Sequence, residues 1–273
     1  MTRPVFASAL PCLRQLEITS GMKFFCVSHR RPRFDPGRDF VCVAPQADGD
    51  RETLLVPEDH FGLGWEGQVL SEYAQLFGLA DALAAGDRSE DILLFQYRKF
   101  VSIRHSGQRW EERPYAFACS PDEAEGLFVT DADLAAREGR TLVGPLVPVP
   151  SLAAQYAQYH PAEDFTRFGL ALTTVEGFDL DRSAALASCR FLIPSPALGI
   201  FSVPTFLRHM SILHQAWAAF LERYYVPREG YQRRVGGFLL ERLHSFLLLD
   251  DAARDELVLA PGYQMVVLNP PSE

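Results

Sequence analysis

Lysine is nearly absent from this sequence, and its scarcity already limits what the protein can bind. Only Lys23 and Lys99 occur, so almost every basic residue is an arginine. The 26 basic residues are outnumbered by 35 acidic ones, which gives a formal net charge of −9. Because a protein that binds nucleic acid needs a basic face to displace phosphate counterions, this balance argues against broad nucleic-acid binding. Anions are therefore expected to bind only at local sites.

Long apolar runs are also missing. No stretch approaches the roughly 18 consecutive apolar residues that a membrane-spanning helix needs. The short stretch RPVFASALPCL is interrupted by prolines and no cleavage site of small residues follows it, so we do not interpret it as a signal peptide. We expect residues 1–21 to be an N-terminal extension and residues 22–273 to form the functional domain. The sequence leaves open whether Met1 or Met22 is the native start.

Cysteine shows no recognisable pattern. Its five occurrences, at positions 12, 26, 42, 119 and 189, have neither the spacing of a metal site nor that of a disulfide framework. We therefore expect reduced cysteines that lie mostly in the core, and a cytoplasmic protein.

Short apolar runs and helical periodicities alternate along the rest of the chain. Hydrophobic residues make up 48% of its 273 residues, which is enough for a sizeable core. The expected strands cover residues 22–29, 39–45, 91–102 and 141–150, and residues 189–203 are expected to form either two short strands or a strand and a loop. The expected helices cover residues 68–85, 131–138, 204–224 and 232–249. This alternation predicts a single α/β domain with a mainly parallel sheet and a helical C-terminal part.

Five segments of the chain resemble a known protein family in their order and spacing. They read KFFCVSHRRPRF, LSEYAQLFGLADAL, FQYRKF, SLAAQYAQYHPAEDF and YQRRVGGFLLERLHSFLL. Together, over about residues 22–250, they resemble the capsular-polysaccharide glycosyltransferases that were long catalogued only as a domain of unknown function. The family's His-Tyr-Arg-Arg is Gln96-Tyr97-Arg98-Lys99 here, and the acidic stretch before the family's first helix is not recognisable.

The resemblance implies a GT-A-like fold with a nucleotide-binding sheet. It also implies transfer of a hexosyl group from a nucleotide-sugar donor to a hydroxyl of a growing bacterial surface polysaccharide. The acceptor would be a saccharide or a lipid-linked saccharide, and a lipid-linked acceptor would allow peripheral association with the inner membrane. The two departures from the family pattern keep an alternative open, a catalytically inactive relative that binds or assembles carbohydrate.

The apolar run at residues 92–95 is followed, after Gln96, by Tyr97, Arg98 and Lys99. Ligands of open α/β sheets bind at the carboxyl ends of the strands, and a transferase must stabilise charge on the departing diphosphate. Arginine can bind two phosphate oxygens and lysine supplies a compact positive charge, so these three residues are candidates for binding the donor diphosphate. The alternative is that only one of the two cations faces the site, while the other pairs on the surface.

No Asp-x-Asp motif follows this strand, although many sugar-nucleotide transferases use such a pair to hold a divalent metal on the diphosphate. Asp131 and Asp133 do form an Asp-x-Asp, but it precedes an expected helix, where capping explains it better. We therefore expect no cofactor, and a divalent metal that is compatible with the reaction but not essential to it.

Three more residues are candidates for contacting the donor. His29 and Arg30 follow the first expected strand, where they are placed to bind the nucleotide, and the alternative is a solvated basic loop. Glu72 lies among apolar neighbours in the first expected helix. It is a candidate for orienting the donor or a cation, although a carboxylate on a helix surface is the commoner outcome.

Glu241 is our main candidate for the catalytic base. It matches the Glu of the family's Gly-Phe-x-x-Glu-Arg-Leu segment, and its apolar flanks predict a largely buried helix, where a raised pKa would suit a general base. The alternative is a structural ion pair with Arg242 or Arg234. Arg242 is a further candidate for the diphosphate, and Gly236 and Gly237 are expected to allow close approach of the substrate.

His160 and Asp164 are four residues apart and share a helical face if Pro161 lies in a first turn. Such a pair would bind sugar hydroxyls or act as a base, which makes both residues candidate catalytic groups. Structural capping is the alternative.

Overall fold

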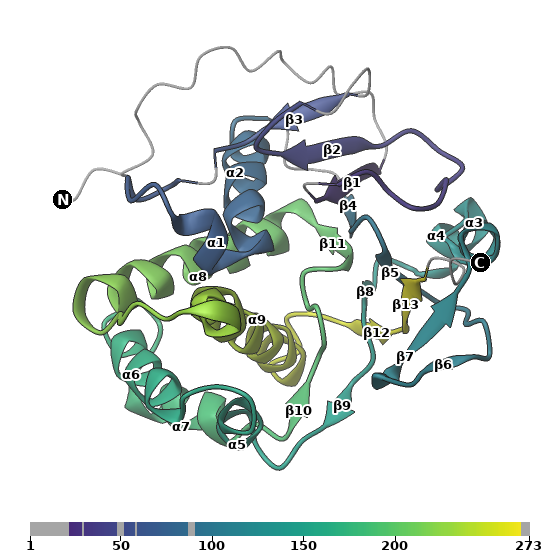
Figure 1. Cartoon of the computed structure of the whole chain (residues 1–273). Coiled ribbons are helices and arrows are strands. Elements are labelled where there is room, and N and C mark those ends of the chain that lie inside the picture. The colour runs from purple at the N-terminus through teal and green to yellow at the C-terminus, as the bar shows by residue number, and fades with distance from the viewer. Residues whose placement is uncertain (1–21, 29, 48–51, 58, 87–90, 269–273) are drawn as a thin grey trace.

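A seven-stranded sheet forms the centre of the molecule (Figure 1). Its strands lie in the order β12-β8-β11-β4-β1-β2-β3. Their bounds are β1 (Lys23–Val27), β2 (Val41–Ala44), β3 (Thr53–Leu55), β4 (Asp91–Phe95), β8 (Thr141–Val143), β11 (Gly199–Ser202) and β12 (Leu259–Pro261). Strands β3, β2, β1 and β4 are parallel, whereas β11 runs antiparallel to both of its neighbours. The predicted α/β class with a mainly parallel sheet is confirmed.

The computed structural model describes residues 22–28, 30–47, 52–57, 59–86 and 91–268. The predicted extension at 1–21 and the candidate His29 lie outside these ranges. Within them, no helix combines the length and the apolar character that crossing a membrane requires. The same ranges contain no group of three or more His, Cys, Asp and Glu side chains placed to hold a metal ion.

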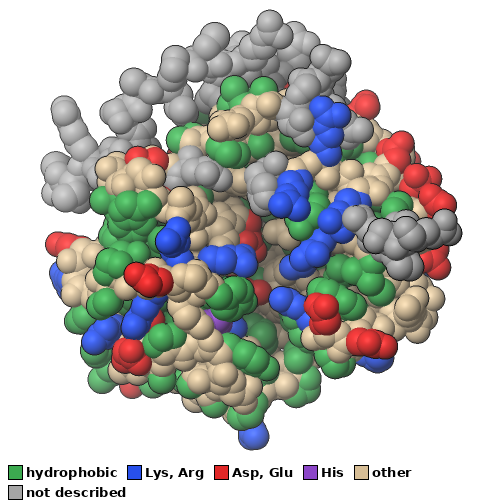
Figure 2. Space-filling model, in the orientation of Figure 1, with side chains coloured by type: hydrophobic (Ala, Val, Ile, Leu, Met, Phe, Trp, Pro, Cys, Tyr) green, Lys and Arg blue, Asp and Glu red, His purple; other side chains and the backbone are tan. Residues whose placement is uncertain are grey.

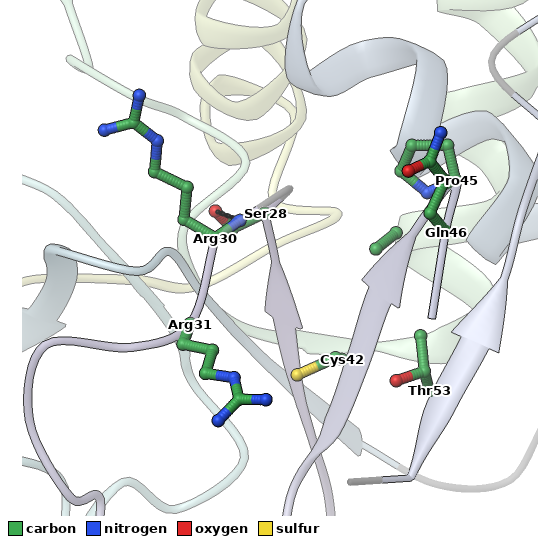
Figure 3. Close-up of a pocket in the computed structure, with 8 residues that line it drawn as sticks. Ser28, Arg30, Arg31, Cys42, Pro45, Gln46 and Thr53 are labelled. Carbon is green, nitrogen blue, oxygen red and sulfur yellow. Dashed lines mark hydrogen bonds between the residues drawn. The ribbon is translucent and has the colours of Figure 1, made fainter. Parts of the chain in front are cut away.

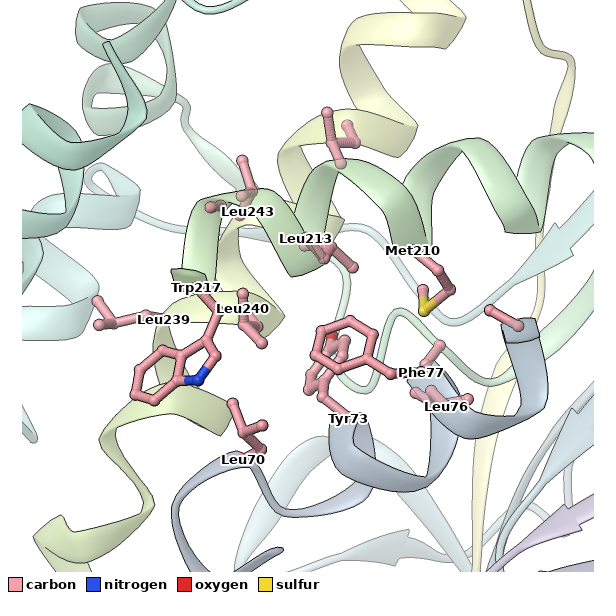
Figure 4. Close-up of a cluster of buried hydrophobic side chains, with 14 of the residues drawn as sticks. Leu70, Tyr73, Leu76, Phe77, Met210, Leu213, Trp217, Leu239, Leu240 and Leu243 are labelled. Carbon is pink, nitrogen blue, oxygen red and sulfur yellow. The ribbon is translucent and has the colours of Figure 1, made fainter. Parts of the chain in front are cut away.

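Helices cover one face of the sheet. They are α1 (Glu66–Leu70), α2 (Glu72–Ala84), α8 (Val203–Arg223) and α9 (Val235–Ala253), with α5 (Leu152–Ala157), α6 (Ala162–Leu172) and α7 (Leu180–Ser188) packed beside them. Side chains alternate along each strand, so Phe25 and Val27 of β1 pack against the helices while Phe24 and Cys26 pack on the opposite face. Figure 4 shows Tyr73 of α2 among side chains of α8 and α9.

Helix α8 illustrates why the longer helices could be predicted. The side-chain oxygen of Ser202 accepts the N–H of Thr205, and Pro204 fits the first turn, where its missing N–H costs nothing. The buried apolar residues then recur at helical spacing, at Phe206, Met210, Leu213, Trp217 and Phe220.

A smaller four-stranded sheet covers part of the opposite face. It has the order β5-β13-β7-β6 and consists of β5 (Lys99–Ser102), β13 (Tyr263–Val267), β7 (Arg113–Cys119) and β6 (Arg109–Trp110). Aromatic rings fill the space between the two sheets, for example Phe34, which lies 5.0 Å from Phe100 and 5.9 Å from Phe95 between ring centroids. Strands β9 (Val147–Pro148) and β10 (Phe191–Leu192) form a separate antiparallel pair.

The Asp-x-Asp motif begins helix α4 (Asp131–Ala136), which follows α3 (Pro121–Leu127). The N–H of Asp133 donates to the side chain of Thr130, and the carboxylate of Asp133 accepts the N–H of Thr130. This reciprocal pair is a capping box, so the interpretation of the motif as helix capping is confirmed.

The predicted strand 91–102 is wrong in one respect, because it forms two strands in two different sheets. β4 ends at Phe95, and backbone hydrogen bonds in both directions between Gln96 and Lys99 (2.8 and 3.2 Å) close a tight turn. β5 then pairs with β13, which lies near the end of the described chain. Because that partner is distant in sequence, no local pattern indicates the reversal. The C-terminal part is also not purely helical, because β12 and β13 follow α9. Both strands pair with strands that are distant in sequence, so no local pattern indicates them.

The predicted helix 68–85 is interrupted at Ser71, whose φ of 56° ends α1 and starts α2. Gly236 and Gly237, in the first turn of α9, pack directly against this junction. A Cβ added to Gly237 would lie 3.0 Å from Ser71 Oγ and 3.1 Å from the carbonyl oxygen of Leu70. The two glycines therefore admit a neighbouring helix junction, and the prediction that they admit substrate is corrected.

We predict that Gly237→Ala lowers the free energy of unfolding by about 1–3 kcal/mol, because the added methyl group must push the α1–α2 junction away. Gly126→Ala is the matched control, since Gly126 lies in α3, where an added Cβ meets nothing within 4 Å. Alanine is the better helix former, so the control should be neutral or slightly stabilising. Urea unfolding measures both, and equal stabilities would contradict the close contact.

Candidate functional site

Figure 2 shows a hollow near the middle of one face, with Lys and Arg side chains on both sides and acidic side chains inside it. In the matching view of Figure 1, this place lies between α9 on one side and β5, β12 and β13 on the other. Helix α9 carries Glu241 and β5 begins with Lys99, and Glu72, Arg98, Arg113 and Glu241 all lie close enough to Lys99 to act on it electrostatically. Four of these five were candidates from the sequence, and they come from α2, α9 and the turn after β4.

Lys99 is the half-buried cation at the centre of this group. It begins β5 directly after the turn that ends β4. Burial lowers its pKa from the ordinary value of 10.5, and the carboxylates of Glu72 and Glu241 partly oppose that change. Its ammonium group makes no hydrogen bond or ion pair with any residue that the structure describes. A cation that is partly desolvated and not directly paired is well suited to bind an anion.

Arg98 and two arginines that follow β1 gather around one ring. The guanidinium carbons of Arg30, Arg33 and Arg98 lie 5.7, 5.4 and 5.5 Å from the ring centroid of Tyr97. Strands β1 and β4 are parallel neighbours, so the segments that follow them meet at the same edge of the sheet. The Nε of Arg98 is buried and finds no hydrogen-bond partner in the described part of the chain. The cations predicted at two strand ends are therefore brought together.

A pocket opens beside these arginines, over strands β1, β2 and β3 (Figure 3). Ser28, Arg30 and Arg31 line one side of it, and Gln46 and Thr53 lie on the other. The backbone N–H of Arg30 donates to the hydroxyl of Ser28 at 3.0 Å, which fixes the turn after β1. Arg30 belongs both to the lining of this pocket and to the arginine cluster on Tyr97, so the pocket and the cluster are neighbours at the same sheet edge.

Glu241 lies in α9, where the predicted ion pair with Arg242 is present. Arg242 Nη1 donates to Glu241 Oε2 at 2.9 Å, and the N–H of Ser195 donates to Oε1 at 3.1 Å. The Glu241 side chain keeps 27% of its surface exposed, so it is less buried than its apolar flanks suggested. Each carboxylate oxygen accepts one protein hydrogen bond and retains capacity for a second. The carboxylate is thus oriented by protein groups and still reachable.

Arg242 orients Glu241 and does not face the hollow openly. It is 4% exposed, and its guanidinium donates to Gln155 Oε1 (2.9 and 3.1 Å), to the carbonyl of Phe238 (3.0 Å) and to Glu241. These bonds use four of its five N–H groups, which leaves little for the diphosphate contact that the sequence suggested.

Glu72 is the first residue of α2 and is held by a second arginine. Its Oε2 lies 3.9 Å from Arg234 Nη2, and Arg234 also donates from Nε to Ser71 Oγ at 2.7 Å. The strained junction at Ser71 therefore fixes the position of Glu72 at the start of α2, within electrostatic range of Lys99. The side chain is 27% exposed, like that of Glu241.

His160 and Asp164 are not brought together as a pair. Asp164 is 1% exposed and accepts two hydrogen bonds from Arg228, at 2.7 and 3.1 Å. His160 Nδ1 lies 2.9 Å from Gln232 Oε1, and burial lowers its pKa. Pro161 stands between α5 and α6, so the two residues do not share one continuous helix, and the predicted geometry is corrected. Asp164 is part of a buried ion pair.

Two polar residues of the hollow were missed by sequence reasoning. Arg113 and Tyr115 lie at the start of β7, and Arg113 Nη1 donates to the hydroxyl of Tyr115 at 3.1 Å. The carboxylate of Glu241 acts on both of them. No strand is predicted over their segment, although the alternation Arg113-x-Tyr115 before an apolar run is a signal for one.

Comparison with known proteins shows which solved structures share this fold. No family model matches the chain, and no curated protein matches it. Among solved structures, the chain is similar to the apo structure of WbbM, a bifunctional glycosyltransferase, with a TM-score of 0.68 at 13% sequence identity. The match covers 93% of this chain and 48% of that one, so the chain spans about half the length of the structure it matches. The predicted glycosyltransferase-like fold is confirmed.

We predict that affinity for a nucleoside diphosphate falls as the pH rises toward the lowered pKa of Lys99, below its ordinary value of 10.5. A bound diphosphate favours the charged ammonium, so loss of its proton removes an attraction. Burial raises the pKa values of Tyr73 and Tyr115, so these groups stay protonated in this range. Lys99→Arg keeps its charge and should bind with little pH dependence.

Isothermal titration calorimetry of both proteins between about pH 7 and about pH 10 measures this difference. Lys99→Ala should bind weakly throughout, because it has no charge to lose. Identical pH profiles for the wild type and Lys99→Arg would show that Lys99 does not contact the diphosphate.

Proposed function

We propose that this chain is a nucleotide-sugar-dependent glycosyltransferase. It transfers a hexosyl group to a hydroxyl of a growing bacterial surface polysaccharide of the capsular, exopolysaccharide or lipopolysaccharide type. The observation that carries the proposal is that Arg98, Glu72 and Glu241 lie within electrostatic range of Lys99, which lies just beyond the carboxyl end of β4 in the parallel sheet. The likeness in fold to the bifunctional glycosyltransferase WbbM supports the transferase class. The polysaccharide acceptor rests on the sequence resemblance.

The donor would lie along the sheet edge. The base would occupy the pocket beside Ser28 and Thr53, and the diphosphate would meet Arg98 and Lys99. Negative charge grows on the diphosphate as the bond to the sugar breaks, and cations already in place stabilise that charge without reorganising. The arginine cluster on Tyr97 supplies such preorganisation, because its members are held against one ring before any ligand arrives.

Glu241 would act as the base. The acceptor oxygen forms a bond to the anomeric carbon, the bond from that carbon to the diphosphate oxygen breaks, and the diphosphate leaves with the electron pair. The hydroxyl proton passes to a free lone pair of the Glu241 carboxylate. Arg242 and the N–H of Ser195 hold that carboxylate in one orientation, at 2.9 and 3.1 Å.

The direct test is a thermal-shift screen against nucleotide-sugars, followed by an assay for released nucleoside diphosphate. A donor that binds only the folded state adds about 2.7 kcal/mol of stability at one hundred times its dissociation constant. We predict stabilisation by at least one nucleotide-sugar and release of its diphosphate in the presence of acceptor. Stabilisation without any turnover would favour the alternative of an inactive carbohydrate-binding protein, and no stabilisation by any donor would refute the proposal.

Divalent metal should not be essential, because cations of the protein itself stand where many transferases place a metal-binding Asp-x-Asp. Turnover in excess chelator should therefore stay within about threefold of the untreated rate, since the protein charges already stabilise the leaving group. Comparison of initial rates with chelator, manganese and magnesium checks this. Activity that disappears with chelator and returns with either metal would show that the expectation is wrong.

Glu241→Gln should lower turnover by a factor of about 10² to 10⁴, because glutamine keeps the shape of the side chain and cannot accept the proton. Donor affinity and melting temperature should change little. Glu222→Gln is the control, since Glu222 is an exposed carboxylate on α8 with 72% of its side chain accessible. If Glu241 serves only as an ion-pair partner of Arg242, the variant will be less stable but turn over normally per folded molecule.

A further inference from the structure

Tyr231 is an exposed aromatic residue that is nevertheless held firmly in place. Its side chain belongs to the short 3₁₀ helix η1 (Gly230–Arg234) just before α9, and the residue is 60% exposed. On its inner side the ring lies 5.0 Å from the ring of Phe238 and is stacked at 6.1 Å and 22° on His160. His160 in turn stacks on Phe238 at 4.0 Å. One side of Tyr231 is packed, and the rest is open to solvent.

The backbone that carries Tyr231 is fixed by its three following neighbours. Gln232 donates to the carbonyl of Tyr159 at 2.7 Å and bonds His160. Arg233 donates to Gln68 at 2.7 Å, and Arg234 donates to Ser71 at the same distance. A turn bonded to both α1 and the α5–α6 connection cannot shift easily, so the exposed ring has a defined position.

This ring lies near the candidate base. Burial acts to lower the pKa of the Arg113 guanidinium, but Tyr115, Glu241 and Tyr231 all lie close enough to raise it. Phe238, which supports Tyr231, is three residues before Glu241 and therefore on the same side of α9. The proposed donor pocket lies elsewhere, beside Ser28, which directly follows β1.

We propose that Tyr231, supported by Phe238 and His160, is the stacking platform of a saccharide subsite for the acceptor. The inference rests on the proposed function and adds the residue that positions the acceptor. A pyranose ring has one face rich in C–H groups, which packs on the negative face of an aromatic ring. Its hydroxyls would then meet the guanidinium of Arg113, the phenol of Tyr115 and the carboxylate of Glu241. Packing on Tyr231 would thus direct an acceptor hydroxyl toward the base.

The test measures saccharide binding apart from donor binding. The probes are the methyl pyranosides of galactose, glucose and N-acetylglucosamine, observed by saturation-transfer NMR of their ring protons. We expect at least one of them to receive saturation from the wild-type protein. Tyr231→Ala should weaken that binding about tenfold, whereas Tyr231→Phe and Tyr231→Trp, which keep an aromatic face, should bind within about twofold of the wild type.

Two comparisons make the result decisive. Tyr159→Ala removes a neighbouring tyrosine of matched exposure, 63%, whose ring is only tilted toward His160, and it should leave binding unchanged. Thermal shift with nucleoside diphosphate on the same variants reports the proposed donor site independently, and it should be equal in all of them. Three results would overturn the proposal that Tyr231 is the stacking platform. They are no saccharide binding by the wild type, binding that Tyr231→Ala leaves unaffected, and binding that both alanine variants lower equally. Nucleotide binding that is lost in Tyr231→Ala alone would also overturn it, because Tyr231 would then belong to the donor site, whereas absence of nucleotide binding in the wild type would refute the proposed function.

Discussion

The tight packing of α9 on the junction between α1 and α2 determines where both carboxylates of the site stand. Gly237 lets the first turn of α9 approach Ser71 so closely that no side chain fits between them. Glu72 follows Ser71 directly, and Glu241 lies one helical turn beyond Gly237. A backbone with positive φ at a non-glycine residue persists only where the surroundings hold it, and here Arg234 binds the Ser71 hydroxyl. The contact between two helices thus sets the distance between two functional groups.

The second constraint is the reversal of the chain at Gln96–Lys99. It moves the chain from the central sheet to the smaller one within a single turn, so both Arg98 and Lys99 lie where the sheets diverge. Gathering cations costs free energy through their mutual repulsion, and in a chain of net charge −9 such a cluster needs a reason. A bound anionic ligand would offset this repulsion between the cations. Solvation of separate surface cations would not explain why they are gathered in one place.

Local patterns were sufficient for the elements that build the sheet edge. The apolar runs before Ser28 and Gln96 predicted β1 and β4, and the strand-end rule then located Arg98 and Lys99. The alternation that begins at Arg113 predicts at most a strand, and only the pairing of β7 with β13, which is distant in sequence, shows to which sheet that strand belongs. The proposed pairing of His160 with Asp164 failed because spacing alone cannot show that Arg228 occupies the carboxylate.

A crystal structure of the protein with bound nucleoside diphosphate would show directly where the phosphates bind. We expect phosphate oxygens within about 3 Å of Lys99 Nζ and of the Arg98 guanidinium, with the base over the ends of β1 and β2. Phosphates bound elsewhere, with Lys99 and Arg98 still facing solvent, would contradict this expectation.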